Sequence, residues 1–334
     1  MLLLREASMN ISVIFTGGTI GCKAKGGFLS TDESTRYALL NGFDAEKAGV
    51  SFTVSKPYSV LSENLSAKEL NMLQQELSDN LGKGYDGIII THGTDSLLYT
   101  SAALEYAFDG CDIPVVLVSA AYPLDDERTN GHKNFEAAVA FIKSRAGKGI
   151  YVSYKNDGED KVNIHRATHI LTHGECSADL YSITEKPFAV YEKGEITVGG
   201  ETALGGSPLG AVKFSDCSGV LVVESHPGDS FSYSLEGVKA ILLRPYHSAT
   251  LNTASERFHA FCKRAKEADI PVFLVNSKAG ITYESTSLFS ELGIRTLPYG
   301  TYVSAYMKIW AAVSLGENVS DFCKKRIAGE FIEA

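Results

Sequence analysis

The sequence predicts an α/β protein with two domains, in which strands of mainly parallel sheets alternate with helices. Short runs of β-branched and other apolar residues, such as Ile88–Ile90 and Val115–Val118, are typical of strands buried on both faces. Segments with helical periodicity separate these runs. The chain has 334 residues and is 44% hydrophobic, which is enough for one large or two moderate cores.

Composition narrows the class of protein. The formal net charge of −9 argues against a nucleic-acid-binding surface. The six cysteines lack C-x-x-C or Cys/His metal spacing, so we expect reduced thiols in a cytoplasmic protein. We expect the protein to work with neither a metal nor an organic cofactor. No apolar stretch is long enough to span a membrane. We therefore do not expect the protein to be bound to a membrane.

The N-terminus is predicted to be an extension of the fold. Its apolar stretch, Leu2–Leu4, is too short for a secretory signal and is followed by a charge. Strand periodicity begins only at Ile11. We therefore expect residues 1–9 to be a disordered extension, with Met9 as an alternative translation start.

The first predicted strand, Ile11–Phe15, leads into a glycine turn that reads T-G-G-T-I at residues 16–20. Gly17 and Gly18 permit positive φ and a close backbone approach to a ligand, and Thr19 adds a hydroxyl beside their amides. Taken alone, this turn fits a phosphate-binding site as well as a catalytic one.

The next predicted elements are a strand at residues 51–55 and a helix that runs through Leu77. Ser66 and Glu69 have the spacing of a capping box, which marks the start of that helix. Between the two elements lies a polar loop that contains Ser62.

A second strand and turn have the same construction as the first. The apolar run Ile88–Ile90 stops at T-H-G-T-D-S, residues 91–96, and a helical pattern opens at Leu97, with Asp95 predicted to cap it. Ligands of open α/β sheets bind at the carboxyl ends of strands. Since both turns follow parallel strands, we expect them to share one crevice.

The rest of the chain continues the alternation of strands and helices. A helix at 133–145 precedes a strand at Gly149–Tyr154, a hairpin turn and a return segment from Lys161 to His169. Six glycines within 193–212 predict a linker between an N-terminal domain at 10–192 and a smaller C-terminal α/β domain at 213–334. For the latter we expect strands at 219–223, 240–243 and 271–275, and helices at 253–268 and 300–316.

The two turns together carry a family resemblance. The motifs at 16–20 and 91–96 resemble those of the bacterial-type L-asparaginase and glutaminase-asparaginase family, and Ser62-Glu63-Asn64 is similar to the family's substrate-binding loop. The resemblance covers residues 10 to about 195 well and the C-terminal part more loosely. It implies the family's two-domain fold, a threonine nucleophile, and a homodimer or homotetramer.

The resemblance also implies a set of site residues. The expected catalytic groups are Thr19, the nucleophile, Thr94, Asp95 and Arg166. The residues expected to bind substrate are Gly18, Ser62, Glu63, Gly93 and Ala120. His92 is expected to support the site as a hydrogen-bond donor without direct chemistry.

Two positions depart from the family pattern. The family carries a catalytic tyrosine on a loop after the first turn, and in the corresponding segment, 23–36, Phe28 matches its place. Tyr37 is the alternative. That segment is rich in Gly, Lys, Ser and Thr and is predicted to be a mobile loop over the site.

The second departure lies on the return segment, where the family carries a catalytic lysine and Arg166 matches its place. A guanidinium stays charged, so Arg166 would support an ionised Asp95 without relaying a proton. Lys161 is the alternative, at the cost of a shift in register.

These observations predict an amidohydrolase that releases ammonia from asparagine, with glutamine or a related small amino-acid amide left open. The alternative is a non-catalytic or very slow amino-acid-binding protein of the same fold. A nucleotide-binding protein is disfavoured because the glycine turn at 16–20 carries neither a G-K-[ST] nor a G-x-G-x-x-G pattern. The tRNA-dependent amidotransferase relatives of the family are set aside, because they carry an extra N-terminal domain and only about ten residues precede the first strand here.

Overall fold

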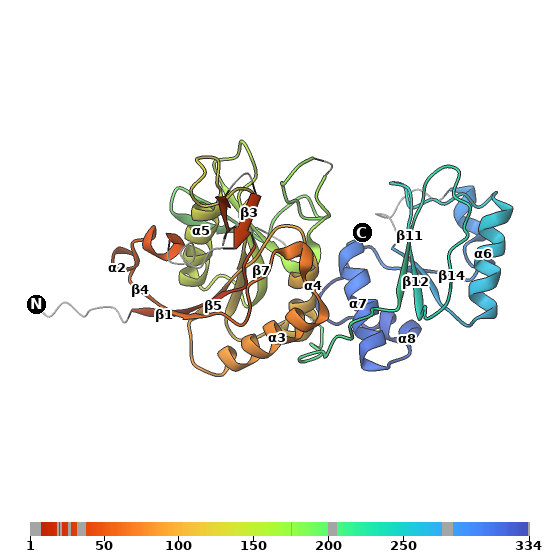
Figure 1. The fold of residues 1–334 in the computed structure, drawn as a ribbon, viewed down its shortest axis with the longest axis horizontal. Coiled ribbons are helices and arrows are strands. Elements are labelled where there is room, and N and C mark those ends of the chain that lie inside the picture. Colours follow the sequence, from red (N-terminus) through yellow and green to blue (C-terminus); the bar gives the residue numbers. More distant parts are fainter. Residues whose placement is uncertain are drawn as a thin grey trace, which may run out of the picture.

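In a computed structural model of the chain, the larger sheet has eight strands in the order β10-β9-β8-β7-β6-β5-β1-β4. Figure 1 shows the fold, with this sheet and the smaller sheet side by side. Strands β4, β1, β5, β6 and β7 are parallel, and β8 to β10 join one edge antiparallel. Their bounds are Met9–Phe15 (β1), Val50–Ser55 (β4), Gly87–Thr91 (β5), Pro114–Val118 (β6), Gly149–Tyr154 (β7), Val162–Arg166 (β8), Ala189–Glu192 (β9) and Glu195–Val198 (β10).

The structure describes residues 8–18, 20, 22–25, 28–31, 38–174, 176–199, 206–275 and 283–332, with no side-chain detail for 22–25 and 28–31. Thr19 and Tyr37 lie outside the described residues, as do most of the predicted extension and the Phe28 side chain.

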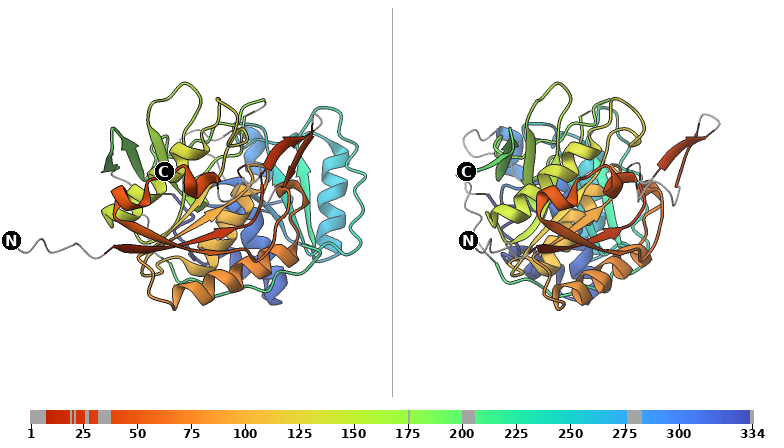
Figure 2. Two further views of the ribbon diagram at one scale, coloured as in Figure 1. Left: turned by 60° about the vertical axis from the view of Figure 1, so that its left-hand side comes forward. Right: turned by 90° about the vertical axis from the view of Figure 1, so that its left-hand side faces the viewer.

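Helices cover both faces of the large sheet. On one face α3 (Ala67–Leu81) and α4 (Leu97–Phe108) pack against the apolar side chains of the strands, and on the other face α5 (Gly131–Ser144) does so. A short helix, α2 (Ala45–Ala48), precedes β4. Two views in Figure 2 show this three-layer arrangement. The predicted mainly parallel α/β domain is thereby confirmed.

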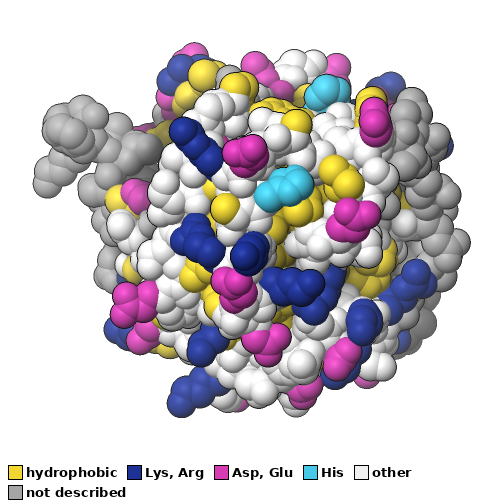
Figure 3. Space-filling model, turned by 90° about the vertical axis from the view of Figure 1, so that its right-hand side faces the viewer, with side chains coloured by type: hydrophobic (Ala, Val, Ile, Leu, Met, Phe, Trp, Pro, Cys, Tyr) yellow, Lys and Arg dark blue, Asp and Glu magenta, His cyan; other side chains and the backbone are white. Residues whose placement is uncertain are grey.

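The smaller sheet is parallel, in the order β11-β12-β13-β14. Its strands are Val220–Glu224 (β11), Ala240–Arg244 (β12), Val272–Val275 (β13) and Ile294–Leu297 (β14). Helix α6 (Glu256–Glu267) covers one face, while α7 (Tyr302–Leu315) and α8 (Val319–Lys324) cover the other. The outer face of this domain carries basic side chains interspersed with acidic ones (Figure 3).

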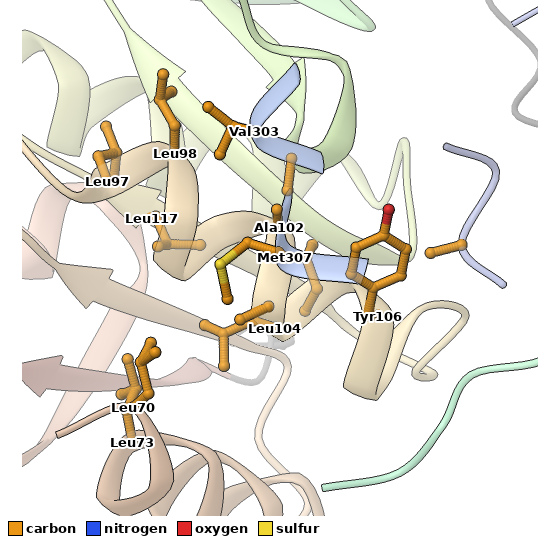
Figure 4. Close-up of a cluster of buried hydrophobic side chains, with 14 of the residues drawn as sticks. Leu70, Leu73, Leu97, Leu98, Ala102, Leu104, Tyr106, Leu117, Val303 and Met307 are labelled. Atoms are coloured by element: carbon orange, nitrogen blue, oxygen red, sulfur yellow. The ribbon is translucent and has the colours of Figure 1, made fainter. Parts of the chain in front are cut away.

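Helix α7 belongs to the cores of both domains. One side of it packs against the small sheet through Ala305 and Ile309. Its other side places Val303 and Met307 against α4, where Leu104 and Tyr106 lie (Figure 4). The Tyr106 hydroxyl also hydrogen-bonds to Ser304. The two sheets are therefore joined through a shared apolar layer.

Several predicted elements match the structure closely. The capping box at Ser66 and Glu69 is present at the start of α3, and β5, β6 and β7 lie where the apolar runs placed them. Part of the predicted linker is instead strand β10, because Lys193 and Gly194 have positive φ and turn the chain back onto β9.

The segment predicted as a mobile loop also differs from expectation. Strands β2 (Cys22–Lys25) and β3 (Phe28–Thr31) pair antiparallel and form a hairpin that projects from the body of the protein (Figure 2). The alternation of residue types in this short polar stretch was too weak to predict strands.

Arg166 lies at a different place from the one that the sequence suggested. Arg166 is on β8 and pairs with Tyr151, in the first half of strand β7, which runs antiparallel to β8. The carboxyl end of β7, at Tyr154, pairs instead with Asn163. From there the guanidinium of Arg166 reaches Glu105 at 2.7 Å and Asp109 at 3.2 Å, near the C-terminal end of α4.

The expected support of Asp95 by Arg166 is therefore wrong. Asp95 precedes the N-terminal end of α4, roughly ten residues and ~15 Å along the helix from Glu105. The buried Glu105 carboxylate also accepts the backbone N–H of Thr168, so Arg166 and Glu105 tie β8 and the following turn to α4. Burial raises the pKa of the Glu105 carboxyl, and the Arg166 charge opposes that shift.

We expect Arg166→Met to lower the free energy of unfolding by about 3–5 kcal/mol, because it removes the strongest counter-charge of the buried Glu105 carboxylate. Urea unfolding measures this loss. The double variant with Glu105→Gln should recover part of it, which a simple packing defect would not do.

The matched control is Arg128→Met. Arg128 forms an equally short ion pair with Asp126, but the side chain is 66% exposed. We expect little change in stability, since exposed pairs contribute little. Equal losses from both variants would contradict a special role for the buried pair.

Candidate active site

The two predicted turns meet backbone to backbone at the carboxyl ends of β1 and β5. A Cβ atom added to Gly18 would lie 2.2 Å from the Gly93 nitrogen, and one added to Gly93 would lie 2.4 Å from the Ser62 hydroxyl oxygen. Gly18 also has φ +75°. Glycine is thus required in both motifs for the turns to approach each other. The two turns lie together, as the sequence predicted.

Side-chain and backbone hydrogen bonds hold this arrangement. The Thr16 hydroxyl donates to the carbonyl oxygen of Thr91 at 2.6 Å, which links the two strand ends. The backbone N–H of Gly18 donates to the Val60 carbonyl at 3.0 Å. A third segment, the 3₁₀ turn η2 (Ser62–Asn64), is thereby brought beside both turns.

Ser62 is the contact between that third segment and the second turn. Its hydroxyl donates to a carboxylate oxygen of Asp95 at 3.0 Å and accepts from the Asp95 backbone N–H at 3.2 Å. The predicted capping of α4 by Asp95 is wrong, because Ser96 is the N-cap residue and no side chain caps this helix. The Asp95 carboxylate is oriented by Ser62 instead.

His92 is a buried structural residue beneath the turn. Its Nδ1 donates to the Gly93 carbonyl at 2.8 Å, and its Nε2 accepts from the Thr100 hydroxyl at 3.0 Å, an arrangement that needs the neutral ring. Burial lowers the pKa of His92 to about 4. The ring therefore stays neutral at physiological pH and orients the turn, in the supporting role expected for it.

A pocket of 560 Å³ opens beside Ser62 and Asp95, between the two domains. Its N-terminal wall comes from η2, α3 and α4, and its C-terminal wall from β11, β12 and α7. The lining residues are Ser62, Glu63, Leu65, Leu70, Asp95, Ser96, Tyr99, Val222, Arg244, Tyr302, Tyr306 and Trp310. We call this space the interdomain pocket.

The predicted site residues are distributed as follows. Gly18, Ser62, Gly93, Thr94 and Asp95 come together at the two turns. Glu63 is exposed at the rim of the interdomain pocket, and Ala120 is buried after β6. Arg166 lies apart at the far end of α4 and Lys161 is exposed on the hairpin.

Sequence reasoning did not find the C-terminal wall of the pocket. Arg244 stands at the end of β12, and Tyr302, Tyr306 and Trp310 recur on one face of α7. The four-residue spacing of the α7 aromatics was visible, but it is also typical of a helix that faces a core.

Two structural properties of the described residues bear on cofactors and membranes. No group of three or more His, Cys, Asp or Glu side chains in the described ranges is arranged to hold a metal ion. None of the helices in that part of the chain is long and apolar enough to cross a membrane.

Comparison with known proteins gives sequence relatives of two kinds, amidotransferase subunits and an L-asparaginase. The family description "Asparaginase, N-terminal" matches residues 10–203, more than half of the chain. A subunit of the glutamyl-tRNA(Gln) amidotransferase of Methanosarcina mazei is 26% identical over 80% of this chain and 64% of its own length. An L-asparaginase of Thermococcus kodakarensis is 28% identical over 60% of each chain. The chain thus spans less than two thirds of these relatives.

Solved structures share the whole fold. The thermostable L-asparaginase from Thermococcus kodakarensis superposes with a TM-score of 0.80 at 22% identity, covering 98% of this chain and all of that one. L-asparaginase I from Vibrio cholerae O1 gives a TM-score of 0.78 at 20% identity, with the same coverage. These likenesses confirm the predicted two-domain fold.

The contact between the turns predicts the effect of a single methyl group. Gly93→Ala should lower the free energy of unfolding by about 1–3 kcal/mol, because its Cβ has no room beside Ser62. Gly82→Ala is the control, since the nearest atom to its Cβ is 4.0 Å away. Denaturant unfolding of both variants tests this, and equal stability would show that the turns can separate freely.

The neutral His92 predicts a dependence of stability on pH. Unfolded His92 binds a proton near pH 6.5 and folded His92 only near pH 4, so the unfolded state binds more protons between these values. The free energy of unfolding should therefore fall by about 2 kcal/mol from pH 7 to pH 5 through this group. In His92→Gln that slope should be shallower; an unchanged slope would assign it to other groups.

Proposed function

Because the chain belongs to the asparaginase family, we propose that it is an amidohydrolase that releases ammonia from the side-chain amide of L-asparagine. The observation that carries this proposal is the meeting of three segments at one point. A hydroxyl at Thr94, an oriented carboxylate at Asp95 and a hydroxyl at Ser62 adjoin the closely packed backbone of Gly18 and Gly93. These are groups that amide hydrolysis needs.

The proposed reaction has two stages. The Thr19 hydroxyl adds to the amide carbon, its proton passes to the leaving nitrogen, and ammonia departs to leave an acyl ester. Water then adds to the ester, and the product carboxylate and the Thr19 hydroxyl are released. Backbone N–H groups of the turns would stabilise the oxyanion in both stages, and Thr94 would position the proton transfer or the water.

In this proposal the carboxylates beside the turns bind the α-ammonium group of the substrate. Asp95 is held in place by Ser62, and Glu63 is exposed next to it. Two carboxylates at one edge of the crevice favour a cation. Arg166, which is engaged with Glu105 and Asp109, has no part in this scheme.

Further parts of the proposal concern the setting of the enzyme. We assign it to the cytoplasm, acting as a homodimer or homotetramer on a small amino-acid amide without a nucleic-acid partner. Five described cysteines carry free thiols, which suits a reducing compartment.

A second candidate function is the ammonia-releasing component of an amidotransferase. The match to a glutamyl-tRNA(Gln) amidotransferase component over 80% of the chain favours it. Glutamine would then be the better amide, and a partner protein would receive the ammonia. Ammonia release by the isolated chain from asparagine and from glutamine distinguishes the two functions.

We expect Thr94→Ala to lower kcat for asparagine by about 10²–10⁴-fold, because it removes a hydroxyl from the proton-transfer path. Thr94→Ser keeps that hydroxyl and should retain most of the activity. Ammonia release measures both rates, and thermal unfolding checks that each variant folds.

Near-full activity of Thr94→Ala would remove Thr94 from the mechanism. If the unaltered chain releases ammonia from neither amide but asparagine raises its melting temperature, the chain is a binding protein of the same fold.

A further inference from the structure

We propose that the interdomain pocket is an extension of the substrate site, and that the preferred substrate is a short peptide with asparagine at its N-terminus. The side-chain amide would be hydrolysed at the turns while the rest of the peptide occupies the interdomain pocket. This inference rests on the proposed amidohydrolase function and specifies its substrate class.

Ser62 and Asp95 connect the crevice at the two turns with the interdomain pocket. Ser62 contacts Gly93 at the turns, and it also lines the interdomain pocket together with Asp95. A ligand bound to Asp95 therefore has the pocket beside it. The volume of 560 Å³ lies within the range of about 300–1,000 Å³ of pockets that enclose drug-sized ligands, far more than free asparagine fills.

The charges of the pocket give the ligand a direction. Carboxylates of Glu63 and Asp95 lie on the N-terminal wall, and the guanidinium of Arg244 lies on the C-terminal wall. Arg244 contacts Glu224 at 3.7 Å and Thr172 at 3.4 Å, so its ion pair is long and partly exposed. A carboxylate could still bind this guanidinium with better geometry. The occupant that matches has an ammonium group near the turns and a carboxylate at the far end.

Between the charges the wall is aromatic. Tyr99 of α4 packs edge to face with Tyr306 of α7, with ring centres 5.8 Å apart, and Trp310 adjoins Tyr306 at 6.1 Å. The Arg244 guanidinium lies over the Tyr302 ring at 5.2 Å. Such a surface favours an apolar or aromatic side chain. The second residue of the peptide is therefore expected to be apolar or aromatic.

The reaction leaves the peptide bond intact. One water molecule is consumed, the carbon–nitrogen bond of the side-chain amide breaks, and ammonia leaves. The product is the corresponding peptide with N-terminal aspartate. No oxidant, reductant or further co-reactant is needed.

The first experiment compares four substrates of the unaltered chain: free asparagine, Asn-Phe, Asn-Phe with an amidated C-terminus, and Phe-Asn. Ammonia release gives kcat/KM, and mass spectrometry identifies the deamidated peptide. We expect kcat/KM for Asn-Phe to exceed that of free asparagine by at least about tenfold. The C-terminal amide should lose most of this advantage. Phe-Asn should be the poorest substrate, because its asparagine carries the carboxylate of the dipeptide and not the ammonium.

The second experiment uses Arg244→Gln with Arg257→Gln as the matched control. Arg257 is an exposed residue of α6, which packs on the other face of the small sheet, and it does not line the interdomain pocket. Arg244→Gln should lower kcat/KM for Asn-Phe about 10–100-fold, so that the preference over free asparagine falls. Arg257→Gln should leave the preference unchanged.

Free asparagine as the better substrate would overturn this inference while leaving the proposed function intact. The inference would also be overturned if Arg244→Gln lowered kcat/KM equally for Asn-Phe and for free asparagine. The same holds if a free amino acid activated the enzyme with sigmoidal kinetics and this activation required Arg244. Ammonia release from none of the four compounds would instead overturn the proposed function itself.

Discussion

Burial of helix α4 is the constraint on which most of the structure depends. Its residues from Leu97 to Ala107 are nearly all buried, because the large sheet lies on one side of the helix and α7 on the other. A helix enclosed in this way cannot shift without disrupting both cores. Its N-terminal end is thus a fixed platform for the turn that carries Thr94 and Asp95, and Arg166 anchors its other end through Glu105.

The candidate site is assembled from short contacts around that platform. Gly18, Gly93 and Ser62 come from three segments and approach so closely that side chains larger than hydrogen are excluded at both glycines. The neutral His92 fixes the turn from below. Such preorganisation suits a reaction that needs several groups in register, since each donor is in place before charge develops.

Sharing of α7 between the cores has a functional consequence. The interdomain pocket has one wall from each domain, so its width is set by the packing of α7 on α4. Buried polar contacts reinforce this packing. Lys308 of α7 pairs with Glu330 of the C-terminal segment, and Thr301 donates to the Thr168 carbonyl beside α4. The width of the interdomain pocket is therefore controlled by residues remote from the two turns.

The sequence by itself determined the local elements and the chemistry of the turns. Apolar runs such as Ile88–Ile90, the capping box at Ser66 and the glycine motifs depend on residues that are neighbours in the chain, so they could be predicted from it. Their pattern also carried the family resemblance, and with it the fold.

Only the tertiary structure decided which side chains meet. Asp95 bonds to Ser62, 33 positions away, and Arg166 bonds to Glu105, 61 positions away. Motif alignment put Arg166 near Asp95, but the register of β8 on β7 directs it to the far end of α4. Arg244 and the α7 aromatics enter the pocket for a similar reason. Side-chain partners depend on strand register and helix packing, which no local pattern specifies.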